Sequence, residues 1–373
     1  MSPPFTFQYG PQVVSGIGVS ADLSRLLPDG PVLFVTDANL RALGLCHAAL
    51  AGLAGREVAL FDDVAEDPSE ESALAAVALG RQAGALSVVG FGGGSPMDVA
   101  KAAAYLLGSG EQIDAIYGVG LAQGQGLPLV LVPTTAGTGS EATPISILTV
   151  GETSKKGIVA PALYARWAVL DAALTASLPR HVTAATGVDA MVHAIEAFTS
   201  LRLKNPLSDA LAKEALRLLA ANVRTACDDP GNMAARDAML RGSYLAGLAF
   251  ANAPVAGVHA LAYPLGGHFH VPHGLSNALM LPHVLAHNMP AARDLYAELA
   301  AEIAPEGGAQ GLVEHLRQLT LDIGLSPRLS DVGITASDCD LLADEAMKQE
   351  RLLVNNPLPI TRADAKRMYE AAL

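Results

Sequence analysis

The pattern of strand and helix signals changes once along this chain, near residue 178. Before that point, short apolar runs alternate with helical segments such as 69–84. The runs are VLFVTD (32–37), EVALFDD (57–63), ALSVVGF (85–91), LPLVLVP (127–133) and WAVLD (167–171). Strands that alternate with helices predict a largely parallel, doubly wound sheet. We expect the further run ISILTV (145–150) to join this sheet at an edge.

Beyond Leu178 the strand signals stop, and prolines separate a series of helical patterns. The expected helices are 183–200, 206–227, 232–253, 277–287, 291–304, 310–323, 336–353 and 361–372. The Gly/Pro-rich segment 258–274 is expected to break and fold back. A chain of 373 residues is long enough for two cores. The sequence therefore predicts an α/β domain (1–177), an all-α domain (178–373) and a ligand cleft between them.

A glycine-rich loop, GGGS (92–95), follows one predicted strand and opens a predicted helix. In doubly wound sheets, ligands bind beyond the carboxyl ends of the strands. Glycines allow close approach of an anion, which the helix dipole and free N–H groups favour. Ser95 is a candidate N-cap, with Pro96 at the first helical position and Asp98 completing a capping box. A tight, well-capped turn without a ligand explains these residues equally well, since the spacing is not GxGxxG.

Other residues at predicted strand ends also suit a nucleotide. The loop PTTAGTGSE (133–141) offers hydroxyl and backbone N–H groups. Asp37 can accept hydrogen bonds from both ribose hydroxyls, which favours NAD over NADP. Its alternative role is to cap the segment ANLRALG that follows. Lys155 or Lys156 is within reach of a phosphate or ribose in this arrangement, although an exposed lysine is equally ordinary.

Four residues between 187 and 283 form a candidate metal site: Asp189, His193, His259 and His273. The first two are spaced i and i+4 in an apolar helical pattern, so their side chains leave one helix face. The other two are fourteen positions apart, with Pro264, Gly266 and Gly267 between them. One carboxylate and three imidazoles suit Fe(II), Zn(II), Co(II) or Mn(II).

The alternative is that these histidines are ordinary core residues with hydrogen-bond partners. An acid in an otherwise apolar helix favours the metal, because a carboxylate is rarely buried without a cation or a partner.

The net charge of −13 argues against nucleic acid or an anionic membrane as partner. Three scattered cysteines and an N-terminus without a signal-peptide pattern predict a cytoplasmic protein.

Several strings of the chain, in order, resemble the iron-containing, group III alcohol dehydrogenases. They are GGGSPMDVAK (92–101), PTTAGTGSE (133–141), TAATGVDAMVHAIEAF (183–198) and HALAYPLGGHFHVPHGLSNALMLPHV (259–284). The likeness extends from the start FTFQYGPQVVSGIG to NNPLPIT near the end. It implies a Rossmann-like N-terminal domain and an all-helical, metal-binding C-terminal domain, the architecture shared with dehydroquinate synthase. It also implies NAD, a divalent metal that is often Fe(II), with Zn(II) as the alternative, and a homodimer or larger assembly.

Matching residue by residue, the resemblance implies roles for individual positions. The metal ligands are Asp189, His193, His259 and His273, and the NAD-selecting acid is Asp37. The pyrophosphate loop comprises Gly92, Gly93, Gly94 and Ser95, with Asp98 beside it. The second cofactor loop comprises Thr134, Thr135 and Thr138, and a cofactor-contacting lysine falls at Lys155. Tyr263 stands where many relatives carry a proton-relaying histidine, so we count it as catalytic, with His268 and His270 as nearby substitutes.

The expected activity is that of a metal-dependent, NAD-linked alcohol dehydrogenase or aldehyde reductase. The metal would bind the alcohol oxygen, and hydride would pass to C4 of the nicotinamide. Segments 183–198 and 257–284 contain no Lys or Arg, which favours a small neutral substrate. The same absence counts against a metal-independent maleylacetate reductase and a dehydroquinate synthase-like lyase. A third alternative is a non-catalytic protein in which metal and nucleotide only build an assembly.

Overall fold

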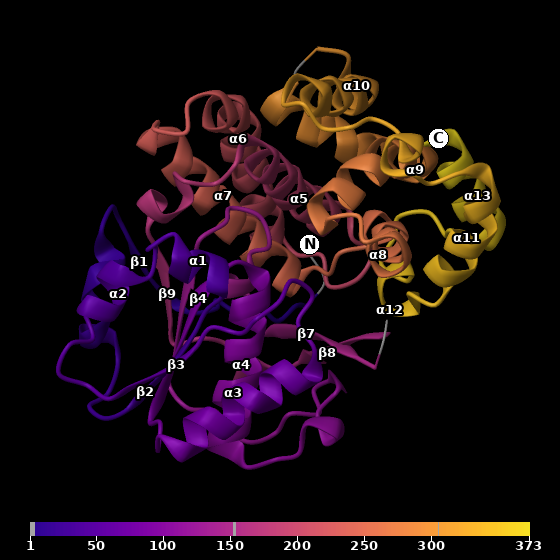
Figure 1. Cartoon of the computed structure of the whole chain (residues 1–373). Coiled ribbons are helices and arrows are strands. Elements are labelled where there is room, and N and C mark those ends of the chain that lie inside the picture. The colour runs from indigo at the N-terminus through magenta and orange to yellow at the C-terminus, as the bar shows by residue number, and fades with distance from the viewer. Residues whose placement is uncertain (1–3, 152–153, 305) are drawn as a thin grey trace. The chain divides into compact units, whose positions relative to one another are not determined.

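The computed structural model describes residues 4–151, 154–304 and 306–373, with the elements labelled in Figure 1. The chain forms two compact units. The sheet unit combines residues 9–135 and 139–176. The helical unit combines residues 177–373 with two short stretches from earlier in the chain, 4–8 and 136–138. These two exchanges could not be predicted, because neither stretch carries a helix or strand pattern.

A six-stranded parallel sheet forms the centre of the sheet unit (Figure 1), in the order β1-β9-β6-β4-β2-β3. Its strands are β1 (Gln12–Ser15), β2 (Val32–Val35), β3 (Val58–Phe61), β4 (Ser87–Gly92), β6 (Leu129–Pro133) and β9 (Trp167–Leu170). The doubly wound parallel sheet is confirmed. The strand β1 was not predicted, because its four residues, QVVS, are mostly exposed and form no continuous apolar run.

Both faces of this sheet are covered, which explains its continuous apolar runs. Leu33 and Val35 of β2 belong to a core shared with α3 (Glu70–Gln82) and α4 (Gly94–Ser109). Phe34, on the opposite face, belongs to a core shared with the 3₁₀ helix η1 (Val19–Leu26), α1 (Ala38–Ala42) and α2 (His47–Ala51). Alternate residues of one strand thus serve two cores.

The run ISILTV does not join the main sheet, so that prediction is wrong. It forms β7 (Ile145–Val150), which pairs antiparallel with β8 (Ser154–Val159) in a separate sheet of order β5-β8-β7. The remaining strand is β5 (Gly118–Val119). Buried and partly buried residues alternate at the start of β7, as expected for a strand with one covered face. The central parallel strands, by contrast, are buried on both.

The helical unit contains only helices among its described residues. They are α5 (Arg180–Thr199), α6 (Pro206–Asp228), α7 (Met233–Asn252), α8 (Gly257–Phe269), α9 (His273–Ile303), α10 (Gly308–Asp322), α11 (Cys339–Met347), α12 (Glu350–Leu353) and α13 (Arg362–Ala371). Short 3₁₀ helices, η6 (Leu329–Val332) and η7 (Ala336–Asp338), precede α11. The predicted α/β plus all-α fold is confirmed.

Prolines and glycines misled the prediction of α8 and α9. The segment expected to break is helical across Pro264, and the expected pair 277–287 and 291–304 is one helix across Pro290. An interior proline removes one backbone hydrogen bond, and burial of the flanking residues outweighs that loss here. The chain turns instead at His270, the C-cap of α8, which has a left-handed φ of 55°. Two residues later, Pro272 is the N-cap of α9.

The predicted helix 336–353 is divided into η7, α11 and α12.

Among the described residues, no single helix has the length and apolar character needed to cross a membrane. Only α7 and α8 taken together do, and that pair is bent by 107°.

Candidate functional site

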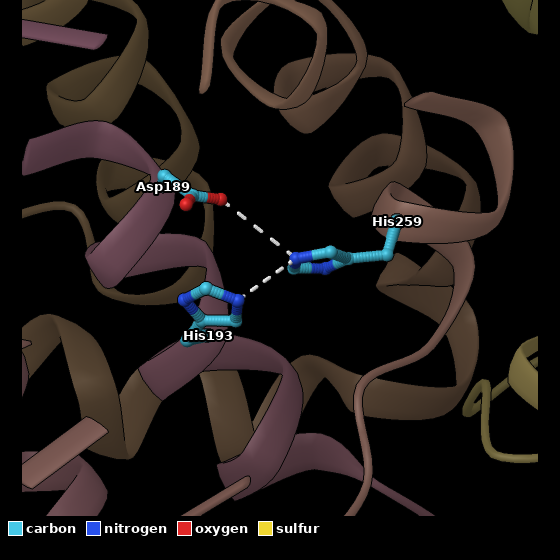
Figure 2. A group of neighbouring side chains, drawn as sticks. All are labelled: Asp189, His193 and His259. Carbon is cyan, nitrogen blue, oxygen red and sulfur yellow. Dashed lines mark hydrogen bonds and ion pairs between the residues drawn. The ribbon is translucent and has the colours of Figure 1, made fainter. Parts of the chain in front are cut away.

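Asp189 and His193 project from one face of α5, one helical turn apart (Figure 2). Every residue of this helix from Gly187 to Thr199 is buried. Asp189 is only 2% exposed and His193 only 5%. The helix and the shared face are as predicted, and both polar groups lie in the interior of the helical unit.

His259 and His273 approach the same two side chains from helices α8 and α9. His259 lies in the first turn of α8, and Figure 2 shows its ring facing Asp189 and His193. His273 is the first residue of α9, directly after the turn at 270–272. The predicted meeting of both rings is found, although a helix and a sharp turn produce it rather than a broken segment.

The spacing of the nitrogen and oxygen atoms suits one ion. His259 Nε2 lies 3.1 Å from His193 Nε2 and 3.8 Å from Asp189 Oδ1. His273 Nε2 lies 3.5 Å from Asp189 Oδ1. Ligand atoms placed tetrahedrally around an ion at roughly 2.1 Å are about 3.4 Å apart. Asp189, His193 and His259 each offer an atom within 4.8 Å of the others, so these three form a candidate site for a divalent cation, with His273 at its edge. Asn277 Nδ2 lies among them, 3.2 Å from His259 Nε2 and 3.3 Å from His273 Nε2, and would have to move aside for the ion.

The charges in this cluster also favour a cation. Burial opposes ionisation of Asp189, yet its imidazole neighbours and the Asn277 amide lower the pKa of its carboxyl. Burial lowers the pKa of His193 to about 3, so this ring is neutral at pH 7 and keeps a lone pair. In the described part of the chain, Asp189 has no ion pair with Lys or Arg. The buried carboxylate therefore lacks a permanent positive partner.

Two residues that the sequence reasoning missed complete the cluster. Asn277 donates through Nδ2 to Asp189 Oδ1 at 2.6 Å, and its Oδ1 has no partner among the described residues. Glu196 lies 2.6 Å from His259 Nδ1 and is 3% exposed. A signal was present, because Glu196 is a second acid in the same apolar helix, seven residues after Asp189, and Asn277 follows His273 by one turn.

Aromatic rings border the cluster. The ring of Phe250 stacks on His193 with centroids 4.4 Å apart. The ring of Tyr263 lies 6.4 Å from that of His259 and 5.9 Å from that of His273. Tyr263 thus lies beside the predicted ligands. His268 points to Glu345, with Nε2 and Oε2 3.7 Å apart, which leaves Tyr263 as the better candidate for a proton relay.

The glycine loop of the sheet unit has the geometry of an anion site, with one correction. Helix α4 begins at Gly94, its N-cap is Gly93, and no side chain caps it. Ser95 is therefore inside the helix, and the predicted capping box with Asp98 is wrong. Gly92 has φ of 152°, and a Cβ there would lie 2.7 Å from Pro96 Cγ. The uncapped helix start fits a phosphate in place of a side chain.

The second loop supplies an unpaired hydroxyl on the sheet unit. Thr135 lies beside Gly93, and its buried Oγ1 has no partner among the described residues. Thr134 is buried, and its N–H donates to Gly92 O at 2.9 Å. Thr138 falls in the stretch 136–138 that belongs to the helical unit. Both the free helix start and the orphaned hydroxyl of Thr135 fit a bound nucleotide.

Asp37 and Lys155 have partners within the sheet unit. Asp37 caps α1, because its Oδ1 accepts from Leu40 N at 2.9 Å. The alternative weighed for Asp37 is thus realised, while its role at a ribose stays a prediction. The Lys155 ammonium pairs with Asp67 on the same unit, and its contact with a cofactor also stays a prediction.

Asp98 organises the loop from within. Its Oδ1 accepts from Ser140 Oγ at 2.6 Å and from the Lys101 ammonium at 3.3 Å, and its Oδ2 accepts from Ile147 N at 2.9 Å. Lys101 is fully buried and also donates to Ser140 Oγ at 2.7 Å. Asp98 therefore links α4 to the second loop, and its predicted contact with the cofactor has no support from these bonds.

Known protein families match nearly the whole chain. The family described as "Iron-containing alcohol dehydrogenase" matches residues 10–172, and "Fe-containing alcohol dehydrogenase family, C-terminal" matches residues 183–373. This chain belongs to the iron-containing alcohol dehydrogenases. The resemblance seen in the sequence is confirmed, and the protein is an oxidoreductase of a family that acts on CH–OH groups.

Individual relatives agree with the family. Long-chain-alcohol dehydrogenase 1 of Geobacillus thermodenitrificans (strain NG80-2) is 41% identical over 353 residues, which cover 91% of this chain and 89% of that protein. Sulfoacetaldehyde reductase of Bilophila wadsworthia (strain 3_1_6) is 36% identical over 377 residues, which cover 96% and 97%. The relatives are thus dehydrogenases and reductases that differ in their named substrates.

Solved structures share the fold of this iron-containing alcohol dehydrogenase. A 1,3-propanediol oxidoreductase has a TM-score of 0.95 at 33% identity, with all of both chains covered. A sulfoacetaldehyde reductase from Bifidobacterium kashiwanohense, solved in complex with NAD+, has a TM-score of 0.90 at 28% identity and covers 100% of this chain and 99% of its own. The expected cofactors, NAD and Fe(II), agree with those of the family.

Proposed function

We propose that this protein is a metal-dependent, NAD(H)-linked alcohol dehydrogenase that also works as an aldehyde reductase. The observation that carries the proposal is the convergence of Asp189, His193 and His259 on one point, with His273 Nε2 3.5 Å from the carboxylate. When bound, a divalent cation supplies a Lewis acid for the substrate oxygen, and the nicotinamide gives or accepts the hydride.

The residues of the helical unit hold that cation and shape its surroundings. Asp189 provides the one charged ligand, and His193, His259 and His273 provide neutral nitrogens. His273 is the most exposed of them, with 39% of its side chain accessible, whereas Asp189 and His259 are each 2% exposed. We therefore assign the substrate side of the cluster to His273 and to its neighbour Tyr263, whose hydroxyl is the candidate proton relay.

The residues of the sheet unit orient the nucleotide. The uncapped start of α4 at Gly94 donates N–H groups to the pyrophosphate, and the left-handed Gly92 keeps the backbone close. The unpartnered Oγ1 of Thr135 supplies a further hydrogen bond. Asp37 accepts from the ribose hydroxyls and disfavours the 2′-phosphate of NADP.

A small neutral alcohol or aldehyde is the substrate class that these surroundings favour. Phe250 and Tyr263 border the cluster, and segments 183–198 and 257–284 carry no Lys or Arg. An anionic substrate of the sulfoacetaldehyde kind would need such a partner near the ligands. A homodimer or larger assembly stays a prediction from the family resemblance.

The test is His273→Ala, with His287→Ala on the same helix as matched control. Within the described structure, His287 Nε2 lies 3.2 Å from Pro359 O, and the ring also interacts with Asp364, outside the cluster. We expect His273→Ala to lose most bound iron and to lower kcat/KM by about 100-fold or more, because removal even of a ligand's outer partner costs 10–100-fold. NADH binding, measured by the fluorescence of its reduced nicotinamide, should be unchanged in both variants.

Activity is measured as NADH formation from short alcohols, with Fe(II) or Zn(II) restored to metal-stripped protein under anaerobic conditions. Full activity of the stripped protein would refute the metal-dependent reaction and favour a reductase of the maleylacetate type. Equal turnover of neutral and anionic substrates would refute the proposed substrate class alone.

A further inference from the structure

Glu196 is a buried acid close to the metal cluster but not a member of it. It lies on α5, seven residues after Asp189 and three after His193, and is 3% exposed. In the described part of the chain it forms no ion pair with Lys or Arg. The ionisable side chain that it contacts there is the imidazole of His259. A buried carboxylate at this position needs strong hydrogen bonds to be tolerated.

Its two oxygens receive three hydrogen bonds from one short stretch. Oε2 accepts from Ala256 N at 2.9 Å and meets His259 Nδ1 at 2.6 Å, and Oε1 accepts from Val258 N at 2.6 Å. These donors lie at the start of α8, whose N-cap Ala256 has no side chain able to cap it. Glu196 therefore caps α8 from a different helix, where a negative charge is also favoured by the dipole.

The same carboxylate fixes the state of the His259 ring. A carboxylate that already accepts two N–H bonds acts as acceptor for the third, so His259 Nδ1 carries the proton. Nε2 then keeps its lone pair, and it points at His193 Nε2, 3.1 Å away, and Asp189 Oδ1, 3.8 Å away. In the opposite tautomer an N–H would occupy the place of the cation.

We propose that Glu196 is a positioning residue that sets the tautomer and orientation of His259 and thereby the affinity of the cluster for a divalent cation. This inference rests on the proposed metal site. It assigns Glu196 two linked tasks, capping α8 and preparing its first histidine, because one carboxylate binds Ala256 N, Val258 N and His259 Nδ1 together. An amide cannot perform both tasks, since its NH₂ group would face one of three donors or force the ring to the other tautomer.

The test variant is Glu196→Gln, and Asp171→Asn is its matched control. Asp171 of the sheet unit is also a buried carboxylate, 1% exposed, which caps a 3₁₀ helix, η5 (Ala172–Thr175), and accepts from Gly18 N, Ser20 N and Ser20 Oγ. It contacts no histidine in the described structure. Both variants lose a buried, hydrogen-bonded charge, but only one loss touches the metal cluster.

The probe is Co(II), titrated into metal-stripped protein under anaerobic conditions against a competing chelator. We expect the Kd of Glu196→Gln to rise 10–100-fold, with an altered Co(II) ligand-field spectrum. Asp171→Asn should lower Tm while keeping the wild-type Kd and spectrum. An unchanged Kd in Glu196→Gln, with a lowered Tm, would reduce Glu196 to a helix cap and overturn the proposal.

A measurement on the wild type keeps the test independent of how well the variant folds. In metal-free protein with ¹⁵N-labelled histidine, the His259 signals should report a proton on Nδ1; a proton on Nε2 would overturn the proposal. If wild-type protein binds no Co(II), the metal site itself fails, and with it both proposals. Co(II) binding that Glu196→Gln leaves unchanged overturns only the role of Glu196.

Discussion

Each unit of the molecule buries a group of carboxylates, and the two groups are neutralised differently. In the sheet unit, Asp98, whose side chain is 14% exposed, pairs with the ammonium of Lys101, which is 0% exposed, and the 1%-exposed Glu141 is attracted to the same ammonium. In the helical unit, Asp189 is 2% and Glu196 is 3% exposed, yet neither has an ion pair with Lys or Arg within the described residues. One group contains its own cation and the other does not.

The difference separates structural charge from functional charge. An acid paired with a lysine of the same chain is a closed arrangement, and Lys101 adds hydrogen bonds to Ser140, Thr143 and Ile145 that hold the second glycine- and threonine-rich loop. A buried acid that faces imidazoles and has no Lys or Arg partner among the described residues can instead take its cation from solution. The comparison therefore indicates a metal in the helical unit and none beside Lys101.

The sharpest way to break this comparison is Asp189→Asn. The substitution keeps the size of the side chain but removes the carboxylate from a group of imidazole rings, so the metal should be lost almost completely. We expect kcat/KM to fall by about 1,000-fold or more, since the Lewis acid is lost with the metal. Metal analysis and initial rates check this expectation, and circular dichroism shows whether the fold is kept. Retention of one metal per chain would contradict it.

The parts of the site that sequence predicted are those in which local periodicity decides position. Spacing of four residues on α5 placed Asp189 and His193 on one face, and strand–glycine–helix order placed Gly92 at a strand end. The contacts of His259 and His273 depend on where α8 ends and on the left-handed His270, which proline and glycine counts do not determine. The sequence offered that pairing only through a Gly/Pro-rich segment expected to fold back, and the resemblance to a family supported it.

Residues that support a candidate site from behind, such as Lys101 and Glu196, were harder to predict because their partners lie far away in the sequence. Lys101 reads as an ordinary helical lysine, yet it contacts residues about forty positions away. Glu196 reads as one more polar residue of α5, although its partners begin sixty residues later. Conversely, local rules favoured Ser95 as a cap, and the structure leaves that helix start free. Local preference was overridden there at a predicted ligand site.

The second prediction concerns Lys101→Met, which removes the internal cation. The partly buried Asp98 and the buried Glu141 would then lose their positive neighbour, and breaking a buried pair costs about 3–5 kcal/mol of unfolding free energy. We expect Tm of the sheet unit to fall by about 10 °C, while the metal content is unchanged. Calorimetry and metal analysis check both parts. The double variant Lys101→Met/Asp98→Asn should recover part of the loss; no recovery would mean that Lys101 stabilises by packing alone.

The smallest expected effect is a pH dependence that arises from Glu141. Burial, opposed by its own backbone N–H and by Lys101, raises the pKa of Glu141 to about 7 from the ordinary 4.5. At a pH between 4.5 and 7, Glu141 holds a proton in the folded chain that it has released in the unfolded chain. The contribution to stability is therefore full below pH 4.5 and is lost as the pH rises through 7, by at most about 3 kcal/mol.

Glu141→Gln keeps the shape of the protonated acid and cannot ionise, so it should remove this dependence. Urea unfolding of the wild type and the variant at pH 5 and pH 8 measures it; the variant should gain stability relative to the wild type at pH 8 and little at pH 5. The exposed Glu66, changed to Gln, is the control and should shift neither value. A variant that loses stability at pH 8 would show that Glu141 is held as an ion by Lys101. The sheet unit would then rest on a complete ion pair, and the contrast with the cation-free carboxylates of the helical unit would be greater still.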